Sequence, residues 1–203
     1  MKDILFVCIQ RYPFEEYNAR PICEARQKEI NVSEDISFSG EKYFTWRLLE
    51  DMFLDFLKID INSLNPRKLE TGKWVVDEYY ISLSNSGKYV MAAISTKSVG
   101  VDVQKLREVY KEHFIEIEMC EEEIEYYTGK EDWEYFFEHV EKEAIYKCFG
   151  TGALEWKKIN TLNYQDKLIT SEFGEYVYSI CSDLITENID LELFINGERI
   201  EFE

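Results

Sequence analysis

The stretch YYISLSNSGKYVMAAISTKSVGVDVQ, residues 79–104, decides the fold of this chain. It contains three short runs rich in aromatic and β-branched residues, at 79–84, 88–95 and 99–104. Polar segments containing Ser, Asn, Gly and Thr separate them, and such runs between turn residues are typical of strands. The stretch therefore predicts an antiparallel meander of three strands.

Helices are expected before and after this meander in the sequence. Apolar side chains recur every fourth residue from Phe44 to Phe56, which predicts a helix over 40–59 whose start Ser39 can cap. Two more helices are expected at 120–127 and 133–149, each followed by a glycine.

Further strands complete the predicted α+β fold. They are expected at 1–10, 167–172, 176–182, 191–195 and 199–202. Asn196-Gly197 joins the last two and is a strong hairpin signal. Residues 11–35 and 60–73 read as irregular. The sequence YVMAAIS at 89–95 resembles YVYSICS at 176–182, which taken alone is weak support for a duplicated unit.

Charge divides the chain of 203 residues and net charge −18 into two unequal halves. Residues 1–98 carry 13 basic and 15 acidic side chains, whereas 99–203 carry 10 and 26. Between Glu112 and Glu143, 13 acids face only two lysines. We expect an anionic substrate to bind the first half. Charge blocks are most often solvated helix faces, and that reading stays open here.

Composition excludes several classes of protein. So acidic a chain is neither a general nucleic-acid binder nor suited to anionic membranes. With 45% hydrophobic and 15% aromatic residues it does not read as disordered. No secretory signal and no run of about 18 apolar residues is visible. The five cysteines form no C-x-x-C pair, so a reducing cytoplasm is the expected location.

Three segments carry side chains suited to phosphate and metal chemistry. Alternation in the strand 99–104 places Asp102 and Gln104 on one face. Their side-chain oxygens could contribute to a site for a hard cation. The same pattern is also typical of an ordinary half-exposed strand. Glu143 and Lys147 are four residues apart and share one helix face, and this spacing usually indicates a surface ion pair. Lys73 and the segment 82–87, rich in Ser, Asn and Gly, can hold a phosphate or form a plain turn.

The order of these segments resembles the 4′-phosphopantetheinyl transferase family, in its longer, monomeric type that activates peptide and polyketide synthetases. The matching elements, over about residues 72–152, are Gly72-Lys73, Ser84-Asn85-Ser86, Gly100-Val-Asp-Val-Gln104 and a helix element, Lys142-Glu-Ala144 with Lys147 followed by Gly150-Thr-Gly152. Residues 26–49 are similar more loosely. No single motif is strong, but four in register are fairly specific.

The resemblance implies a fold and a reaction. The fold would be a pseudo-dimer of two similar α/β subdomains, 1–98 on the nucleotide side and 99–203 on the metal and catalytic-helix side, each an antiparallel sheet packed on helices, with the site between them. Coenzyme A would be cleaved at its pyrophosphate. Its 4′-phosphopantetheine arm would pass to a serine of an apo acyl- or peptidyl-carrier protein, releasing 3′,5′-ADP. We expect a cytoplasmic monomer that binds neither nucleic acid nor membranes.

The resemblance also implies roles for single residues. Mg²⁺ would be held by Asp102, Glu143 and Gln104, and Glu143 or a bound water would take the serine proton. Lys147 would meet the phosphate and support the leaving group. The remaining coenzyme A contacts would come from Lys73, Ser84, Asn85, Arg26 and Lys28, the last two as candidates for the 3′-phosphate.

Four positions depart from the family pattern. Trp74 replaces a proline and His139 a tryptophan, both interpreted as packing changes. Asn85 replaces a histidine expected to touch phosphate, and Gln104 replaces a metal-ligating glutamate. Weaker Mg²⁺ binding is expected. Two alternatives therefore stay open: a weakened or inactive homologue, and an acidic module that binds a basic partner without catalysis.

Overall fold

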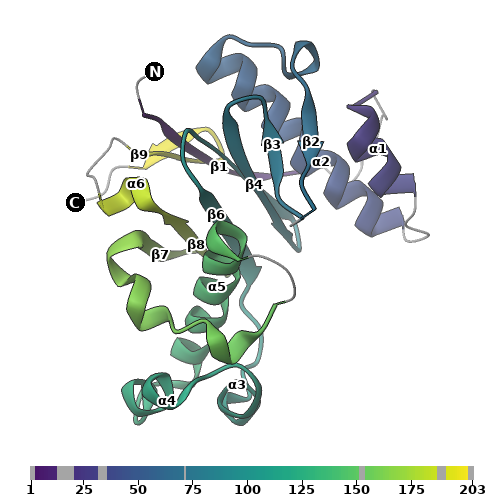
Figure 1. Cartoon of the computed structure of the whole chain (residues 1–203). Helices are drawn as coiled ribbons and strands as arrows, with labels where there is room; N and C mark the ends of the chain where they lie inside the picture. Colours follow the sequence, from purple (N-terminus) through teal and green to yellow (C-terminus); the bar gives the residue numbers. More distant parts are fainter. Residues whose placement is uncertain are drawn as a thin grey trace.

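The computed structural model describes residues 3–12, 21–31, 36–70, 72–150, 154–186 and 191–200 (Figure 1). These residues form two β-sheets and several helices, a mixed α+β fold in which most strands run antiparallel. None of the described helices combines the length and the apolar character needed to cross a membrane.

The larger sheet has seven strands in the order β10-β9-β1-β5-β4-β3-β2. Its strands are β1 (Leu5–Arg11), β2 (Pro66–Lys68), β3 (Trp74–Val76), β4 (Tyr79–Ser86), β5 (Tyr89–Ser95), β9 (Leu191–Ile195) and β10 (Glu198–Ile200). Only the β1–β9 pair is parallel. Two strands from the second half of the chain thus complete the sheet built by the first half.

The smaller sheet has the order β6-β8-β7, with β6 at Val99–Lys105, β7 at Leu168–Phe173 and β8 at Tyr176–Ser182. The predicted meander is therefore wrong in its last step. β4 and β5 pair as expected, but β6 leaves them and pairs with β8. The reason is that β1 occupies the other edge of β5, so β6 crosses to the smaller sheet, where Val101 and Val103 pack into the apolar layer between the two sheets.

One helix covers each sheet on its outer side (Figure 1). α2 (Ile36–Met52), continued by a π-helical turn at Phe53–Leu57, packs on β5 and β4, and α5 (Asp132–Phe149) packs on β6 and β8. The other helical segments are α1 (Glu24–Asn31), α3 (Lys111–Ile117), α4 (Glu121–Tyr127), α6 (Asp183–Thr186) and short 3₁₀ turns at Ile61–Ser63, Trp156–Lys158 and Thr161–Lys167.

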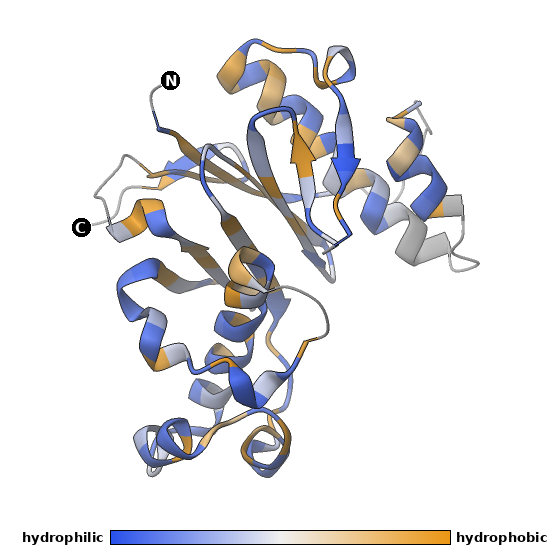
Figure 2. Ribbon diagram, in the orientation of Figure 1, coloured by the Kyte–Doolittle hydropathy of each residue, from blue (hydrophilic) through white to orange (hydrophobic). Residues whose placement is uncertain are grey.

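The core consists of layers between these elements. Trp46, Leu49 and Phe53 fill the space between α2 and the larger sheet. Alternate residues of β1 and β5 point the other way, toward the smaller sheet. Ala144 and Cys148 of α5 pack against the opposite face of that sheet. Figure 2 shows apolar and polar residues alternating along α2, as expected for a helix with one buried side.

Serine side chains join the two sheets where β4 lies beside β6. The hydroxyl oxygens of three alternate β4 residues accept hydrogen bonds from three backbone N–H groups of β6. The bonds are Val101 N to Ser82 Oγ, 3.0 Å, Val103 N to Ser84 Oγ, 3.3 Å, and Lys105 N to Ser86 Oγ, 2.9 Å. We call this the serine seam. It holds β6 in register with β4 although the strands belong to different sheets.

Several element boundaries differ from the sequence-based expectations. The helix expected at 40–59 already begins at Ile36, so position 39 lies inside the helix and not at its start. The segment 11–35 contains α1, 60–73 contains β2, and α3 was not expected. The hairpin at Asn196-Gly197 is confirmed, with φ of 51° and 83° as this turn requires.

Candidate functional site

A cavity of about 380 Å³ lies between the β2–β3 hairpin, β4, the first two helices and the C-terminal end of α5. Among the lining residues that the structure describes, five are cations and none is an aspartate or glutamate. The lining residues that the argument uses are Arg26, Lys42, Lys68, Lys73, Asn85 and Lys147. We call it the cationic cavity. In a chain of net charge −18, so one-sided a lining points to an anionic ligand.

The two helices and β2 bring three of the cations together. Arg26 is buried, and its guanidinium donates to Glu29, 2.6 Å away, and to the carbonyl oxygen of Lys42 at 3.2 Å. The ammonium of Lys68 on β2 also contacts Glu29. Burial lowers the pKa of Lys42, and the nearby charge of Arg26 lowers it further. The lysine would therefore gain from an anion that relieves this repulsion.

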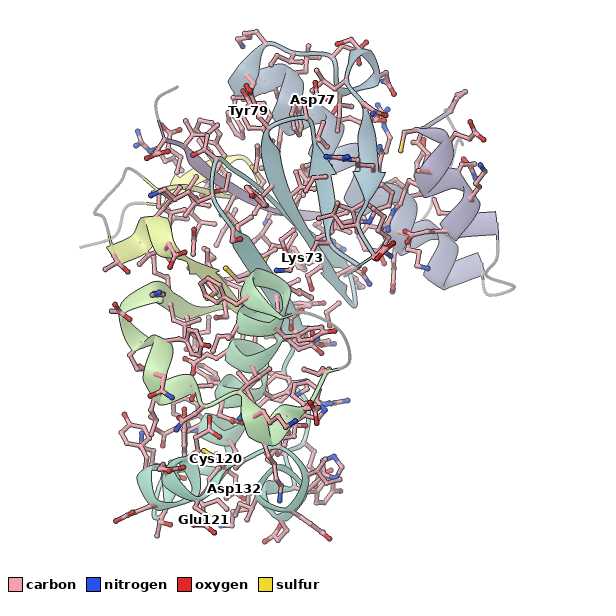
Figure 3. All side chains as sticks on the ribbon, viewed as in Figure 1. Lys73, Asp77, Tyr79, Cys120, Glu121 and Asp132 are labelled. Carbon is pink, nitrogen blue, oxygen red and sulfur yellow. The ribbon has the colours of Figure 1, made fainter. Side chains whose placement is uncertain are left out.

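Lys73 enters the cavity from the turn of the β2–β3 hairpin. The Leu69 N–H donates to the Lys73 carbonyl oxygen at 2.7 Å, and Gly72 takes the positive φ of 84° that the turn needs. The Lys73 ammonium donates to the Cys148 carbonyl oxygen at 2.7 Å, at the C-terminal end of α5 (Figure 3). Burial lowers the pKa of Lys73. One side chain thus links the larger sheet to α5.

Asp102 is the centre of a buried hydrogen-bond network. Its Oδ1 accepts from the Ser84 hydroxyl and from the Lys147 ammonium, each at 2.6 Å. Its Oδ2 accepts from the Gln104 side-chain nitrogen at 3.1 Å. The expected alternation along β6 is confirmed, because Val101 and Val103 point to the apolar layer and Asp102 points to α5.

A close approach of β6 to α5 makes this network possible. A Cβ atom on Gly100 would lie 1.9 Å from the Ala144 carbonyl oxygen and 2.5 Å from the Cys148 nitrogen. Any larger residue at Gly100 would push the helix off the strand. The absence of a side chain therefore sets the distance at which Lys147 reaches Asp102.

Glu143 lies one turn before Lys147 on the same face of α5. Burial raises the pKa of its carboxyl group, Lys147 opposes that rise, and the negative charge of Asp102 adds to it. The two carboxylates are thus close enough to interact. Neighbouring His139 has its Nδ1 2.7 Å from buried Glu118. A half-buried carboxyl group with a raised pKa beside a second carboxylate is a feature of functional sites.

The donor set suits a hard cation in chemistry but is incomplete. Asp102 and Glu143 supply carboxylate oxygens, which Mg²⁺ prefers. Gln104, expected as the third ligand, turns its amide nitrogen to Asp102 and its oxygen to the Ser86 hydroxyl, 3.3 Å away. Within the described part of the chain, no group of three or more acidic, histidine or cysteine side chains is placed to hold a metal. Asp102 and Glu143 are therefore the residues that fit.

The structure brings most of the expected site residues together. Arg26, Lys73, Asn85 and Lys147 line the cationic cavity. Ser84, Asp102 and Gln104 form the adjoining network, and Glu143 lies beside it. Lys28 is the exception: its side chain is 74% exposed and pairs with Glu24 at 2.7 Å, outside the lining of the cavity. Gly150 lines the cavity, whereas Thr151 and Gly152 lie outside the described residues.

Two cavity cations, Lys42 and Lys68, were not expected from the sequence. Lys42 lies near the start of α2, in the basic region 26–49 that already resembled the family loosely. Lys68 was hidden because its segment reads as a loop. The strand pairing of Lys68 opposite Trp74 in the β2–β3 hairpin turns it toward Lys73 and the cavity.

The two residues interpreted as packing changes do pack. Trp74 is buried and its ring lies 4.9 Å from the ring of Trp46. His139 stacks obliquely on Trp156 at 5.1 Å. Asn85, which replaces the histidine expected to touch phosphate, has a polar partner instead: its amide nitrogen donates to Glu41 at 2.7 Å. Its side chain is thus held by an acid at the edge of the cavity.

No protein-family model matches the chain, and no curated protein matches its sequence.

Proposed function

We propose that this protein is a 4′-phosphopantetheinyl transferase, which moves the phosphopantetheine arm of coenzyme A to a serine of an acyl- or peptidyl-carrier protein. The observation that carries the proposal is the cationic cavity, which directly adjoins the carboxylates Asp102 and Glu143. Coenzyme A has three phosphates, and an anion of that charge needs several cations around it.

The cavity residues are proposed to hold the nucleotide part of coenzyme A. Arg26 and Lys42 lie on the two helices, and Lys68 and Lys73 lie on the β2–β3 hairpin, so the phosphates would be held from two sides. Lys147 faces them from α5. Because phosphoryl transfer depends mainly on positioning and charge stabilisation, such an enclosure supplies most of what the reaction requires.

The transfer step would use the carboxylates next to the cavity. The serine oxygen of the carrier would attack the phosphorus next to pantetheine, and the bond to the bridging oxygen would break, releasing 3′,5′-ADP. Glu143 is the proposed acceptor of the serine proton, since burial raises the pKa of its carboxyl group toward the range of an effective base. Lys147 would stabilise the charge on the departing phosphate.

Asp102 and Glu143 would hold Mg²⁺. When bound, the ion would supply positive charge to neutralise the pyrophosphate. With two carboxylates instead of three, we expect this binding to be weak, which agrees with the orientation of Gln104.

The proposed pseudo-dimer has support in the two central strands. β5 and β8, which carry the related sequences YVMAAIS and YVYSICS, each pair antiparallel with a strand on both sides. Each also lies under a long helix, α2 for β5 and α5 for β8. We propose that these are equivalent positions of two related units, with the site between them. The protein would act as a cytoplasmic monomer.

A second candidate is a homologue that binds coenzyme A without transferring its arm. Two observations favour it: Asn85 is held by Glu41, and Gln104 presents a nitrogen to Asp102. The acidic-module alternative is weaker. Glu118, Glu123 and Glu138 of the acidic segment are buried and bonded inside the molecule, so they offer no charge to a partner.

Mass spectrometry of carrier proteins tests the proposal. The chain is incubated with coenzyme A, Mg²⁺ and several apo carrier proteins, beside a known transferase as a positive control. We expect at least one carrier to gain one phosphopantetheine group. If no carrier gains mass while the known transferase succeeds on all of them, the transferase proposal is wrong.

Two matched variants locate the chemistry. Glu143→Gln should abolish the mass gain, whereas Glu141→Gln, two residues away on another face of α5, should keep it. Calorimetry with coenzyme A separates the two candidates, because binding without transfer identifies the inactive homologue. No binding of coenzyme A with or without Mg²⁺ would exclude both.

A further inference from the structure

Lys147 stands between a buried carboxylate and the cationic cavity. Its ammonium lies 2.6 Å from Asp102 Oδ1 and 3.2 Å from the Val101 carbonyl oxygen, and the residue also lines the cavity. The side chain is 26% exposed, whereas that of Asp102 is 2% exposed. An ammonium has three N–H bonds, and these two acceptors are its partners in the described part of the chain. The third N–H remains for a ligand.

Asp102 has no free position on its Oδ1 oxygen for a second cation while Lys147 is present. Its Oδ1 already accepts from Ser84 and Lys147, and its Oδ2 accepts from Gln104. A divalent ion bound to Oδ1 would lie about 2 Å from that oxygen. It would then be close to an ammonium held 2.6 Å from the same atom, and two cations so near each other repel strongly.

The cavity offers Lys147 an alternative partner. Its other cations have internal partners: Arg26 and Lys68 contact Glu29, and Lys73 donates to the Cys148 carbonyl oxygen. Lys147 alone among these pairs with a carboxylate of the proposed metal site. An anion in the cavity would attract the Lys147 ammonium by a rotation of its flexible side chain, without movement of α5.

We propose that Lys147 and a divalent cation compete for Asp102, and that an anion in the cationic cavity decides the competition. With the cavity empty, Lys147 pairs with Asp102 and excludes the ion. With an anion bound, Lys147 turns to the anion and Asp102 accepts the ion. This inference rests on the proposed function only in assigning the metal to Asp102 and the anion to the cavity.

The competition makes the two binding events cooperative. Each ligand favours the state in which Lys147 has left Asp102, so each raises the affinity for the other by the same factor. Couplings of this kind are typically about 5-fold to 150-fold in affinity. We therefore expect a tenfold change or more, seen equally from the metal and from the anion.

Binding of Mn²⁺, followed by electron paramagnetic resonance, tests this coupling on the full chain. The anion probe is adenosine 3′,5′-bisphosphate, which has no pyrophosphate, and its own complexes with Mn²⁺ are measured in protein-free samples. We expect saturating probe to lower the Mn²⁺ dissociation constant about tenfold or more. Calorimetry should show the same factor for the probe when Mn²⁺ is added.

Two variants make the test specific. Lys147→Met should bind Mn²⁺ without the probe about as tightly as the unmodified chain does with it, and the probe should then have no effect. Lys68→Met is the matched control, since Lys68 lines the cavity and contacts Glu29 instead of Asp102. It should weaken probe binding and keep the full Mn²⁺ shift at saturating probe.

The possible failures are distinguishable. If the unmodified chain binds both ligands independently, or if Lys147→Met leaves Mn²⁺ affinity unchanged, the competition is wrong even where carriers are modified. The same holds if either ligand fails to bind. If carriers gain no mass but the coupling appears and disappears with Lys147, the transferase proposal fails and the competition stands.

Discussion

Helix α5 carries two lysines, five positions apart, whose surroundings are opposite in kind. Lys142 is fully buried and its ammonium contacts Glu123 Oε2 at 2.7 Å and Glu138 Oε1 at 3.0 Å. It also donates to the carbonyl oxygens of Trp156 and Ile159. Among the described residues Lys147 has one carboxylate partner, Asp102, and its side chain lines the cationic cavity.

The difference lies in how many fixed acceptors surround each ammonium. Lys142 has four acceptors, which come from α4, α5 and the segment after α5. All three N–H bonds of its ammonium are therefore used, and the side chain is fixed in place. Glu123 is itself held by the backbone N–H groups of Cys120 and Thr161 at 2.9 and 2.7 Å. Lys142 is therefore structural. Lys147 keeps bonding capacity toward the cavity, which is what a ligand-binding lysine needs.

Removal of Lys142 should destabilise the fold, and this loss of stability is the largest expected. Lys142→Met leaves Glu123 and Glu138 buried without their cation, and breaking a buried pair in this way costs about 3–5 kcal/mol. Lys147→Met should cost less, about 1–2 kcal/mol, because Asp102 keeps its bonds from Ser84 and Gln104. Urea denaturation measures both.

A second substitution checks the cause. Glu138→Gln on the Lys142→Met background removes one uncompensated charge and should restore part of the lost stability. Equal losses for the two lysine variants, or no recovery in the double variant, would show that the distinction between the two lysines is mistaken.

Glu141 sharpens the comparison, since it is a buried carboxyl group on the same helix that no lysine neutralises fully. Burial raises its pKa to about 7, against the opposing effects of a Thr170 hydrogen bond and of Lys130. A carboxyl group with a raised pKa in the folded state stabilises the fold below its unfolded pKa and loses that contribution as pH rises through about 7.

Glu141→Gln should therefore change the pH dependence of stability. At pH 8 the variant should be more stable than the unmodified chain by up to about 3 kcal/mol, and below pH 4.5 the two should be nearly equal. Urea denaturation at pH 4 and pH 8 measures the difference. Exposed Glu172→Gln serves as the control and should show no such trend. The same gain for Glu141→Gln at both pH values would contradict the prediction.

The serine seam gives the smallest expected effect. Ser84→Ala removes a donor to Asp102 and an acceptor for the Val103 N–H, and should cost about 1 kcal/mol in thermal or urea unfolding. Ser86→Ala, at a half-exposed position of the same seam, should cost less because water can replace its hydroxyl group. A larger loss for Ser86→Ala than for Ser84→Ala would show that support of Asp102 is not what the seam provides.

The acidic segment 112–143 shows where sequence reasoning about charge reached its limit. Its composition favours solvated helix faces, and several of its glutamates are exposed. Yet Glu118, Glu123 and Glu138 are buried, each beside His139 or Lys142. A count of charges cannot tell a solvated glutamate from one paired inside the molecule, because the partners come from other elements.

Local patterns determined most elements of this protein. Period-two alternation placed Asp102 on the polar face of β6, four-residue spacing put Glu143 and Lys147 on one face of α5, and Asn196-Gly197 formed its hairpin. Each depends on residues close in sequence, whose geometry the backbone repeats. The order of the motifs also predicted side chains of the candidate site, and several of these line the cationic cavity.

Only the tertiary structure decided how these parts meet. β6 leaves the predicted meander because β1 takes the place beside β5, and β9 pairs with the other edge of β1. Lys42 and Lys68 join the cavity while Lys28 points away from it, a choice made by helix packing and by the register of one short hairpin. Burial and long-range pairing are properties of the whole chain, so no local pattern contains them.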